Sequence, residues 1–238
     1  MVSIEKKDLL FDGNEKQIYS TAKADEVIIR YKDVATAYAG VKRARFKGLG
    51  CLNNQISGIL FQTLEKEGIS THYIAQNGER EQLCRKISLV DLLVVVHNRI
   101  AGSLAHRLGL EEGFRTPNVV VEFRYNNDAL GNPPINGDEA VALGMVNYDE
   151  VDYIIETAHK VNKILSARFD ACGIELVDFK LEFGRYDGRL IVSDELSPDR
   201  CRLRDKQTGD ILDKDRFRHD MGGVMDAYEY VFTLLNRM

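Results

Sequence analysis

The stretch that most constrains this chain runs from residue 176 to residue 199 and has the sequence LVDFKLEFGRYDGRLIVSDELSPD. Asp178, Lys180 and Glu182 alternate with apolar residues in its first half, which predicts a β-strand with one polar and one apolar face. Asp187-Gly188 is a turn signal, and an apolar strand follows it, so we predict a β-hairpin. The two carboxylates suit a divalent cation and the lysine suits a phosphate, although a solvated outer face explains the same pattern.

The register of this hairpin decides whether Asp194 shares the polar face. A two-residue loop at Asp187-Gly188 pairs Glu182 with Ser193, and Asp194 then points to the opposite face. Because Asp194-Glu195 at the end of a strand is suited to facing a ligand, we predict a loop with an odd number of residues, or a β-bulge. Either feature lets Glu182 and Asp194 hold one metal ion.

Size and charge limit the classes of partner. The 238 residues are enough for one large domain or for two small lobes that share a cleft. The net charge of −5 gives no general nucleic-acid-binding surface, so local clusters must hold any anionic ligand. We expect no membrane partner, because no apolar run spans a bilayer and the start, MVSIEKKDLLF, lacks a signal-peptide core. The four cysteines lie far apart without a CxxC pair, which is typical of reduced thiols in a cytoplasmic protein.

Strands and amphipathic helices are predicted along the rest of the chain. We expect a hairpin at residues 9–19 with Lys16 beyond its turn, as a candidate phosphate ligand or simply as a surface lysine. Asn53-Asn54 is expected to cap a helix at 55–67. Asp149 is expected to cap a helix at 148–172 that ends at Gly173. We also expect strands at 26–31, 71–75, 83–87, 89–96 and 119–125, and a last helix at 221–235.

A polar turn, HNRIAGS at residues 97–103, follows the apolar run at 89–96, which we expect to be a strand buried on both faces. Arg99 and Ser103 are candidates for holding a phosphate or a carboxylate, because the arginine fork binds oxyanions bidentately. His97 at the end of a strand is more often structural than catalytic.

The hairpin resembles the signature of the SAICAR synthetase family, the phosphoribosylaminoimidazole-succinocarboxamide synthases of purine biosynthesis. The matching segments are VDFKLEFG at 177–184 and DELSPD at 194–199, and the resemblance covers nearly the whole chain. It implies an α+β fold of antiparallel sheets and packed helices, related to ATP-grasp and kinase-like folds. It also implies two lobes, residues 1–86 and 87–238, with the ATP cleft between them.

The resemblance also implies ligands and roles. The implied ATP ligands are Lys16, Arg85, Lys86, Lys180 and Glu182, and those of Mg²⁺ are Glu182 and Asp194. The implied ligands of the carboxylate nucleotide and L-aspartate are His97, Arg99, Ser103, Asn126, Asp128, Asn132, Asp199, Arg202 and Arg218. Asp178, Lys180 and Asp194 are implied to be catalytic, with Asp178 orienting Lys180 or accepting a proton from the incoming ammonium. Without the resemblance, residues 213–218 are simply a charged helix start.

The reaction that the resemblance implies is ATP-driven amide formation. ATP phosphorylates a carboxylate on an aminoimidazole ribonucleotide, the amine of L-aspartate attacks the acyl phosphate, and phosphate leaves. Mg²⁺ offsets the charge of the γ-phosphate. The partners are therefore small molecules and not nucleic acid, and the family resemblance suggests a homo-oligomer.

Several positions depart from the family pattern and leave three functions open. Asn14 and Asn126 stand in place of lysines, His97 of an arginine, Asn132 of an aspartate, and Arg204 of a tryptophan. The first function is a SAICAR synthetase of purine synthesis. The second is a paralogue with the same chemistry on another heterocycle, such as a pyrazole C-nucleoside carboxylate in antibiotic biosynthesis. The third is a non-catalytic nucleotide-binding relative.

Overall fold

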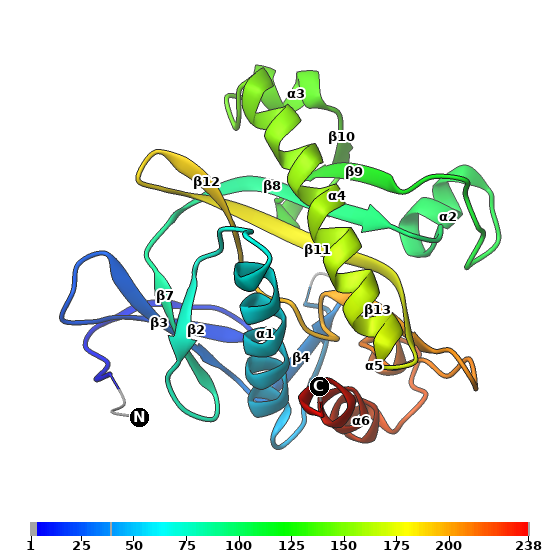
Figure 1. Cartoon of the computed structure of the whole chain (residues 1–238), viewed down its shortest axis with the longest axis horizontal. Helices are drawn as coiled ribbons and strands as arrows, with labels where there is room; N and C mark the ends of the chain where they lie inside the picture. The colour runs from blue at the N-terminus through cyan, green and yellow to red at the C-terminus, as the bar shows by residue number, and fades with distance from the viewer. Residues whose placement is uncertain (1–3, 39, 238) are drawn as a thin grey trace.

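The computed structural model describes residues 4–38 and 40–237, so the first three residues of MVSIEKKDLLF lie outside it. The described chain forms three antiparallel sheets with helices packed around them (Figure 1). This is the predicted α+β class. In the described part of the chain, no helix combines the length and apolar character needed to cross a bilayer.

A five-stranded sheet forms the first part of the chain, in the order β1-β2-β3-β7-β6. The predicted hairpin around Gly13 is present as β1 and β2, and the strand predicted at 26–31 is β3. A separate two-stranded sheet follows β3. The bounds are β1 Leu9–Asp12, β2 Lys16–Ser20, β3 Glu26–Tyr31, β4 Val34–Ala37, β5 Lys42–Arg45, β6 Tyr73–Gln76 and β7 Glu81–Arg85.

A six-stranded sheet contains the rest of the strands, in the order β10-β9-β8-β11-β12, with β13 also paired to β11. The predicted burial of residues 89–96 holds from Leu92 onward, whereas Leu89 is 58% exposed. The bounds are β8 Ser88–His97, β9 Val120–Tyr125, β10 Pro134–Ile135, β11 Ile174–Tyr186, β12 Arg189–Ser193 and β13 Cys201–Asp205.

The helices complete the fold, and the first begins earlier than predicted. Asn54 does not cap α1: it is fully buried inside the helix and donates from Nδ2 to the carbonyl of Glu79 at 2.9 Å. Gly48, with φ of 92°, precedes the helix instead. The bounds are α1 Leu49–Lys66, α2 Gly102–Leu108, α3 Gly137–Ala142, α4 Tyr148–Ala171, α5 Asp215–Arg218 and α6 Val224–Asn236, with a 3-10 turn at Asp128–Leu130.

The long helix α4 is capped by Asn147, not by the predicted Asp149. Asn147 Oδ1 accepts from the amide of Glu150 at 2.9 Å, and the Glu150 carboxylate accepts from the amide of Asn147 at 3.0 Å. This reciprocal pair is a capping box. Asp149 lies in the first turn, where its charge still favours the helix dipole. Gly173 follows the helix with φ of 73°, as predicted for a helix end.

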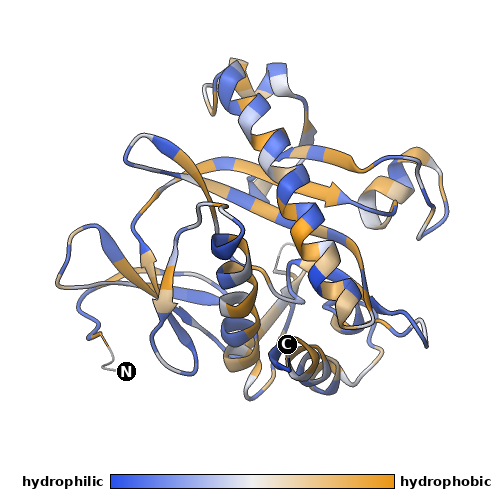
Figure 2. Ribbon diagram, in the orientation of Figure 1, coloured by the Kyte–Doolittle hydropathy of each residue, from blue (hydrophilic) through white to orange (hydrophobic). Residues whose placement is uncertain are grey.

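One hydrophobic core joins the six-stranded sheet to the helices, while the centre of the five-stranded sheet, around Tyr31 of β3, forms a separate, smaller cluster. Phe61 of α1, Leu165 of α4, Phe183 of β11 and Val231 of α6 are all fully buried in the same cluster. Helix α4 lies across β8 and β11, and α1 packs against α6 (Figure 1). Figure 2 shows long hydrophobic stretches along the central strands and mainly hydrophilic loops. The polar residues of β11 therefore stand out within an apolar sheet.

The register of the central hairpin corrects our prediction. Glu182 pairs with Ser193, and Asp187-Gly188 forms a two-residue loop with positive φ at both positions, so there is neither an odd loop nor a bulge between β11 and β12. The strand ends at Ser193, and Asp194 has a left-handed φ of 65°. That backbone conformation redirects the side chain, so Asp194 and Glu182 line the same cavity without any shift in register.

Replacing Asn147 by alanine should lower the free energy of unfolding by roughly 0.5–2 kcal/mol, because the amide of Glu150 at the start of α4 loses its partner. Asp149→Ala is the matched control, and it should cost at most about 0.5 kcal/mol, since only a dipole interaction is lost. Urea denaturation followed by circular dichroism measures both. An equal or larger loss in Asp149→Ala would contradict the capping assignment.

Candidate functional site

A cavity of about 480 Å³ lies where the two large sheets approach each other. The β1–β2 hairpin, β4, β8, β11, α5 and the loops after β9, β12 and β13 all contribute to its walls. Nine of the predicted site residues line it. They are Lys16, Asn126, Asp128, Asn132, Lys180, Glu182, Asp194, Asp199 and Arg218.

A second, smaller cavity of about 170 Å³ adjoins the first. It shares Leu93, Asn132 and Lys180 with the main cavity, and the predicted residues His97, Ser103 and Arg202 line it. Lys180 therefore lies between the two spaces. A group bound in one cavity can meet a group bound in the other beside this amine.

Carboxylates and cations alternate along one side of the main cavity. Lys16 Nζ lies 2.5 Å from Oδ1 of Asp194 and 2.8 Å from Oε2 of Glu195. Arg200 Nη2 lies 2.7 Å from Oδ2 of Asp194 and 3.5 Å from Oε1 of Glu182. Lys16 comes from β2, so this cluster joins the start of the chain to the loop after β12.

The two carboxylates assigned to metal binding have opposite pKa shifts. Burial and the neighbouring charge of Asp194 raise the pKa of Glu182 to about 7. Burial acts in the same direction on Asp194, but Arg200 and Lys16 outweigh it and lower the pKa of Asp194 to about 2. Glu182 thus lies where burial and a neighbouring carboxylate disfavour its charged form.

This donor set fits a magnesium ion that arrives with a nucleotide. Glu182 and Asp194 line one cavity, and the raised pKa of Glu182 marks a place that an added cation would stabilise. Among the described residues there is no group of three or more His, Cys, Asp or Glu arranged to hold a metal. Mg²⁺ commonly binds one or two carboxylates and completes its shell with phosphate oxygens and water, so two carboxylates suffice.

The amine of Lys180 has an unusual environment. Burial, followed by the charges of Arg200, Arg218 and Arg202, lowers its pKa to about 7. Asp178 does not form an ion pair with it. The Asp178 carboxylate instead accepts from Arg202 Nη1 at 2.7 Å and lies 3.5 Å from Nδ1 of His97.

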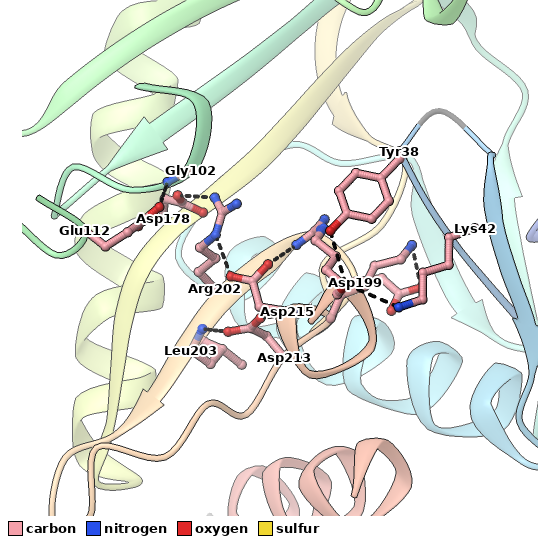
Figure 3. A network of polar contacts seen from close by, with 12 residues as sticks. Tyr38, Lys42, Gly102, Glu112, Asp178, Asp199, Arg202, Leu203, Asp213 and Asp215 are labelled. Atoms are coloured by element: carbon pink, nitrogen blue, oxygen red, sulfur yellow. Dashed lines mark hydrogen bonds and ion pairs between the residues drawn. The ribbon is translucent and has the colours of Figure 1, made fainter. Parts of the chain in front are cut away.

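Arg202 connects β11 to α5 (Figure 3). Its guanidinium donates to Asp178 at 2.7 Å and to Asp215 at 2.9 Å, and Asp215 also accepts from Arg218 at 2.5 Å. Gly102 lies against this guanidinium with φ of 58°, and a Cβ there would lie 2.6 Å from Nη2 of Arg202. A side chain here would be strained by the left-handed backbone and would displace the end of the arginine from its carboxylates.

Three charged residues of the cavity wall were not foreseen. Lys214 Nζ lies 2.6 Å from Oε1 of Glu15 and 3.4 Å from Oδ2 of Asp199, and Arg200 bridges two carboxylates as described above. Tyr228 donates to the other oxygen of Asp199 at 2.6 Å. In the sequence, Glu15 and Arg200 each stand next to a predicted site residue. This position was the one local feature that pointed to them.

Arg85, Lys86 and Arg99 line neither cavity. Arg85 donates to the carbonyls of Thr71 and Tyr73 at 2.7 and 3.0 Å, and Arg99 donates to Glu175 at 2.7 Å. The backbone amide of Lys86 donates to the carbonyl of Asp25 at 2.7 Å. These side chains and amides thus have partners within the fold.

The residues that depart from the family pattern lie at different distances from the cavities. Asn14, Asn126 and Asn132 line the main cavity, and His97 lines the smaller one. Both ring nitrogens of His97 are buried without a hydrogen bond within the described chain. Arg204 lines neither cavity and is 2.6 Å from Asp213.

Comparison with protein families matches residues 9–235 to the model described as SAICAR synthetase. A phosphoribosylaminoimidazole-succinocarboxamide synthase of Clostridium botulinum, strain Eklund 17B / Type B, is 52% identical over 98% of this chain and 100% of its own length. The enzyme of the same name from Clostridium acetobutylicum is 48% identical, covering 99% of each chain.

Solved structures give the same relationship. The phosphoribosylaminoimidazole-succinocarboxamide synthase from Ehrlichia chaffeensis has a TM-score of 0.94 at 37% identity, covering 97% of this chain and 99% of its own. A SAICAR synthetase in complex with ADP has a TM-score of 0.92 at 44% identity, covering 96% of this chain and 97% of its own.

Glu182 should make stability depend on pH in buffer free of nucleotide and divalent cations. Its pKa is about 7 in the folded protein against 4.5 for an unperturbed glutamate, so the folded state binds the proton more tightly. The free energy of unfolding should therefore fall as the pH rises through this window, relative to the variant Glu182→Gln. Urea denaturation across the window measures the slope. Glu156→Gln, an exposed surface change, should keep the wild-type slope, and equal slopes in wild type and Glu182→Gln would contradict the assignment.

Proposed function

Because the chain belongs to the SAICAR synthetase family, we propose that it condenses an aminoimidazole carboxylate ribonucleotide with L-aspartate, at the expense of ATP. The products are an N-succinocarboxamide, ADP and phosphate, in purine biosynthesis. The observation that carries the proposal is the convergence of Lys16, Lys180, Glu182 and Asp194 on one cavity. These residue types are the ones that phosphoryl transfer requires.

The proposal places ATP between an N-terminal lobe, residues 1–86, and a larger lobe, residues 87–238. Support comes from the cavity walls, since Lys16 belongs to the first segment and Glu182 to the second. The backbone around Arg85 and Lys86, at the end of β7 and just before β8, is proposed to meet the adenine. This arrangement is the basis for proposing a relation to ATP-grasp and kinase-like folds.

Glu182 and Asp194 are proposed to hold Mg²⁺ together with nucleotide phosphates. A bound Mg²⁺ supplies charge neutralisation for the transferred phosphoryl group. Lys16 and Lys180 act as point charges toward phosphoryl oxygens. Lys16 must then share its amine between the nucleotide and the carboxylates of Asp194 and Glu195, to which it is paired at 2.5 and 2.8 Å.

The chemistry proceeds through an acyl phosphate. An oxygen of the heterocyclic carboxylate attacks the γ-phosphorus of ATP, and ADP leaves. The aspartate amine then attacks the acyl carbon, the C–O bond to phosphate breaks, and the amine loses protons to form the amide. The position of Lys180 between the two cavities supports placing the acyl phosphate beside it. Asp178 is engaged by Arg202, so its role in this proposal is to fix that arginine.

The remaining predicted residues are assigned to the anionic substrates. The small cavity, with His97, Ser103 and Arg202, is proposed to take a carboxylate-bearing part of a substrate, because Arg202 presents its guanidinium there. The main cavity offers Asn126, Asp128, Asn132, Asp199 and Arg218 for the rest of the nucleotide. Arg99 lines neither cavity, so we propose it as an anion ligand only for a part of the substrates that lies outside both cavities.

The relatives described above carry the name of the purine enzyme, and no observation favours a pyrazole acceptor or a non-catalytic protein. We also propose that the protein is cytoplasmic and forms a homo-oligomer. Size-exclusion chromatography with light scattering measures the mass of the assembly.

A coupled ADP-release assay tests the function directly. With ATP, Mg²⁺, the aminoimidazole carboxylate ribonucleotide and L-aspartate, we expect steady turnover and a succinocarboxamide product detectable by mass spectrometry. Omitting L-aspartate should abolish product formation. Binding of ATP without turnover, and turnover with a pyrazole carboxylate instead, would overturn the purine assignment.

Lys16→Met should lower kcat/KM for ATP by about 30-fold or more, since losing a charged contact in a buried site costs about 2 kcal/mol or more. Lys23→Met is the matched control, because Lys23 is 69% exposed on the same lobe and pairs with Glu26. Steady-state kinetics at varied ATP measures both. A Lys16→Met enzyme with the kinetics of Lys23→Met would contradict a phosphate-binding role.

A further inference from the structure

Arg200 occupies the place between the two carboxylates that we assign to the divalent cation. Its Nη2 is 2.7 Å from Asp194 and 3.5 Å from Glu182. Within the described chain, no other cationic side chain lies within 4.0 Å of the Glu182 carboxylate, whereas Asp194 is also paired with Lys16. Arg200 is therefore the counter-charge that Glu182 shares with Asp194.

The backbone of Arg200 is held by hydrogen bonds, but one donor of its side chain has no hydrogen-bond partner. Its carbonyl accepts from the amide of Lys180 at 2.9 Å, and its amide donates to the carbonyl of Ser197 at 2.9 Å. The side chain lines the main cavity and is 25% exposed. Its Nε is buried without a hydrogen-bond partner. Arg200 is therefore held by its backbone, while the Nε donor of its side chain has no partner within the described chain.

A divalent cation and this guanidinium cannot both bind the same oxygens, because like charges in a buried site repel strongly. When the cation binds Glu182 and Asp194, Arg200 must find another acceptor. The other carboxylates of the wall already have partners among the described residues. Glu15 pairs with Lys214 at 2.6 Å, Asp128 accepts from Nδ2 of Asn132 at 2.9 Å, and Asp199 accepts from Tyr228 at 2.6 Å. The acceptor must therefore arrive with the ligand.

We propose that Arg200 is a positioning residue that exchanges partners when the nucleotide binds. It holds Glu182 and Asp194 together first, and it then donates to phosphoryl oxygens, which match the guanidinium fork. The identity of the nucleotide as ATP rests on the proposed function, but the exchange of partners does not. As a consequence, the cation and the nucleotide bind with positive coupling. The cation releases Arg200 to bind the nucleotide, and the nucleotide supplies the acceptor that Arg200 needs once the cation has taken its carboxylates.

Titration of Mn²⁺ alone into the full chain, followed by electron paramagnetic resonance, tests the first step. Arg200→Gln should bind Mn²⁺ about tenfold more tightly than wild type, because no cation has to leave the carboxylates. Arg200→Lys keeps a charge and should stay close to wild type. Arg189→Gln removes an exposed arginine at the start of β12, outside both cavities, and should also match wild type.

Titration of a non-hydrolysable ATP analogue in the presence of Mn²⁺ tests the second step. Arg200→Gln should bind the analogue about tenfold more weakly than wild type, and Arg200→Lys should be intermediate, because it lacks the fork. In cation-free buffer Arg200→Gln should also have a lower Tm, which Mn²⁺ restores. Equal Mn²⁺ affinity or equal analogue affinity in Arg200→Gln and wild type would overturn the proposal. Failure of the proposed function has a different signature, namely a wild type that binds both ligands yet releases no ADP with the aminoimidazole carboxylate and L-aspartate.

Discussion

Three carboxylates are buried close together at one point of the structure, and the fold places cations beside them. These carboxylates are Glu182, Asp194 and Glu195. The side chain of Glu195 is 1% exposed and those of the other two are at most 16% exposed. Buried charges of one sign are costly unless cations lie beside them. The fold supplies Lys16 and Arg200 from opposite parts of the chain, so the cluster exists only when both sheets are in place.

Strand β11 makes this arrangement possible because two different strands share one of its edges. Strand β12 pairs with its C-terminal half and β13 with its N-terminal half. The loop between β12 and β13, residues 194–200, interrupts the strand pairing along this edge beside Lys180 and Glu182 of β11. The left-handed Asp194 begins that loop, so a strained backbone position lies at the point where the side chains converge.

Much of the secondary structure follows from local pattern. Periodicity of two predicted β11, and a period of three and four residues predicted α4, because one face of each element must be apolar to pack on the core. The helix starts were less predictable. Asn54 and Asn147 are the same residue type, but one ties α1 to a distant loop and the other caps α4, and only the packing partners decide which.

The site was predictable to the extent that its residues lie in one motif. Lys180, Glu182 and Asp194 lie within 15 positions of one another in the printed sequence, and these residue types suit a cation and a phosphate, although a solvated outer face explained the alternation as well. Glu15, Lys214 and Arg200 escaped because surface charges of these types are common. What distinguishes them is a partner far along the chain, as for Lys214 and Glu15, which are 199 residues apart.

The sequence by itself determined the α+β class, the central hairpin and the acidic and basic residues of β11 that line the main cavity, because these depend on alternation and residue chemistry within short segments. Tertiary structure alone decided that Asp194 meets Glu182 across an unshifted register, that Asp178 is bound by Arg202, and that Arg200 lies between the proposed metal ligands. The reason is that an ion pair forms only when the fold brings two distant charges within a few ångströms of each other. The pattern of residues within a short segment carries no information about such distant partners.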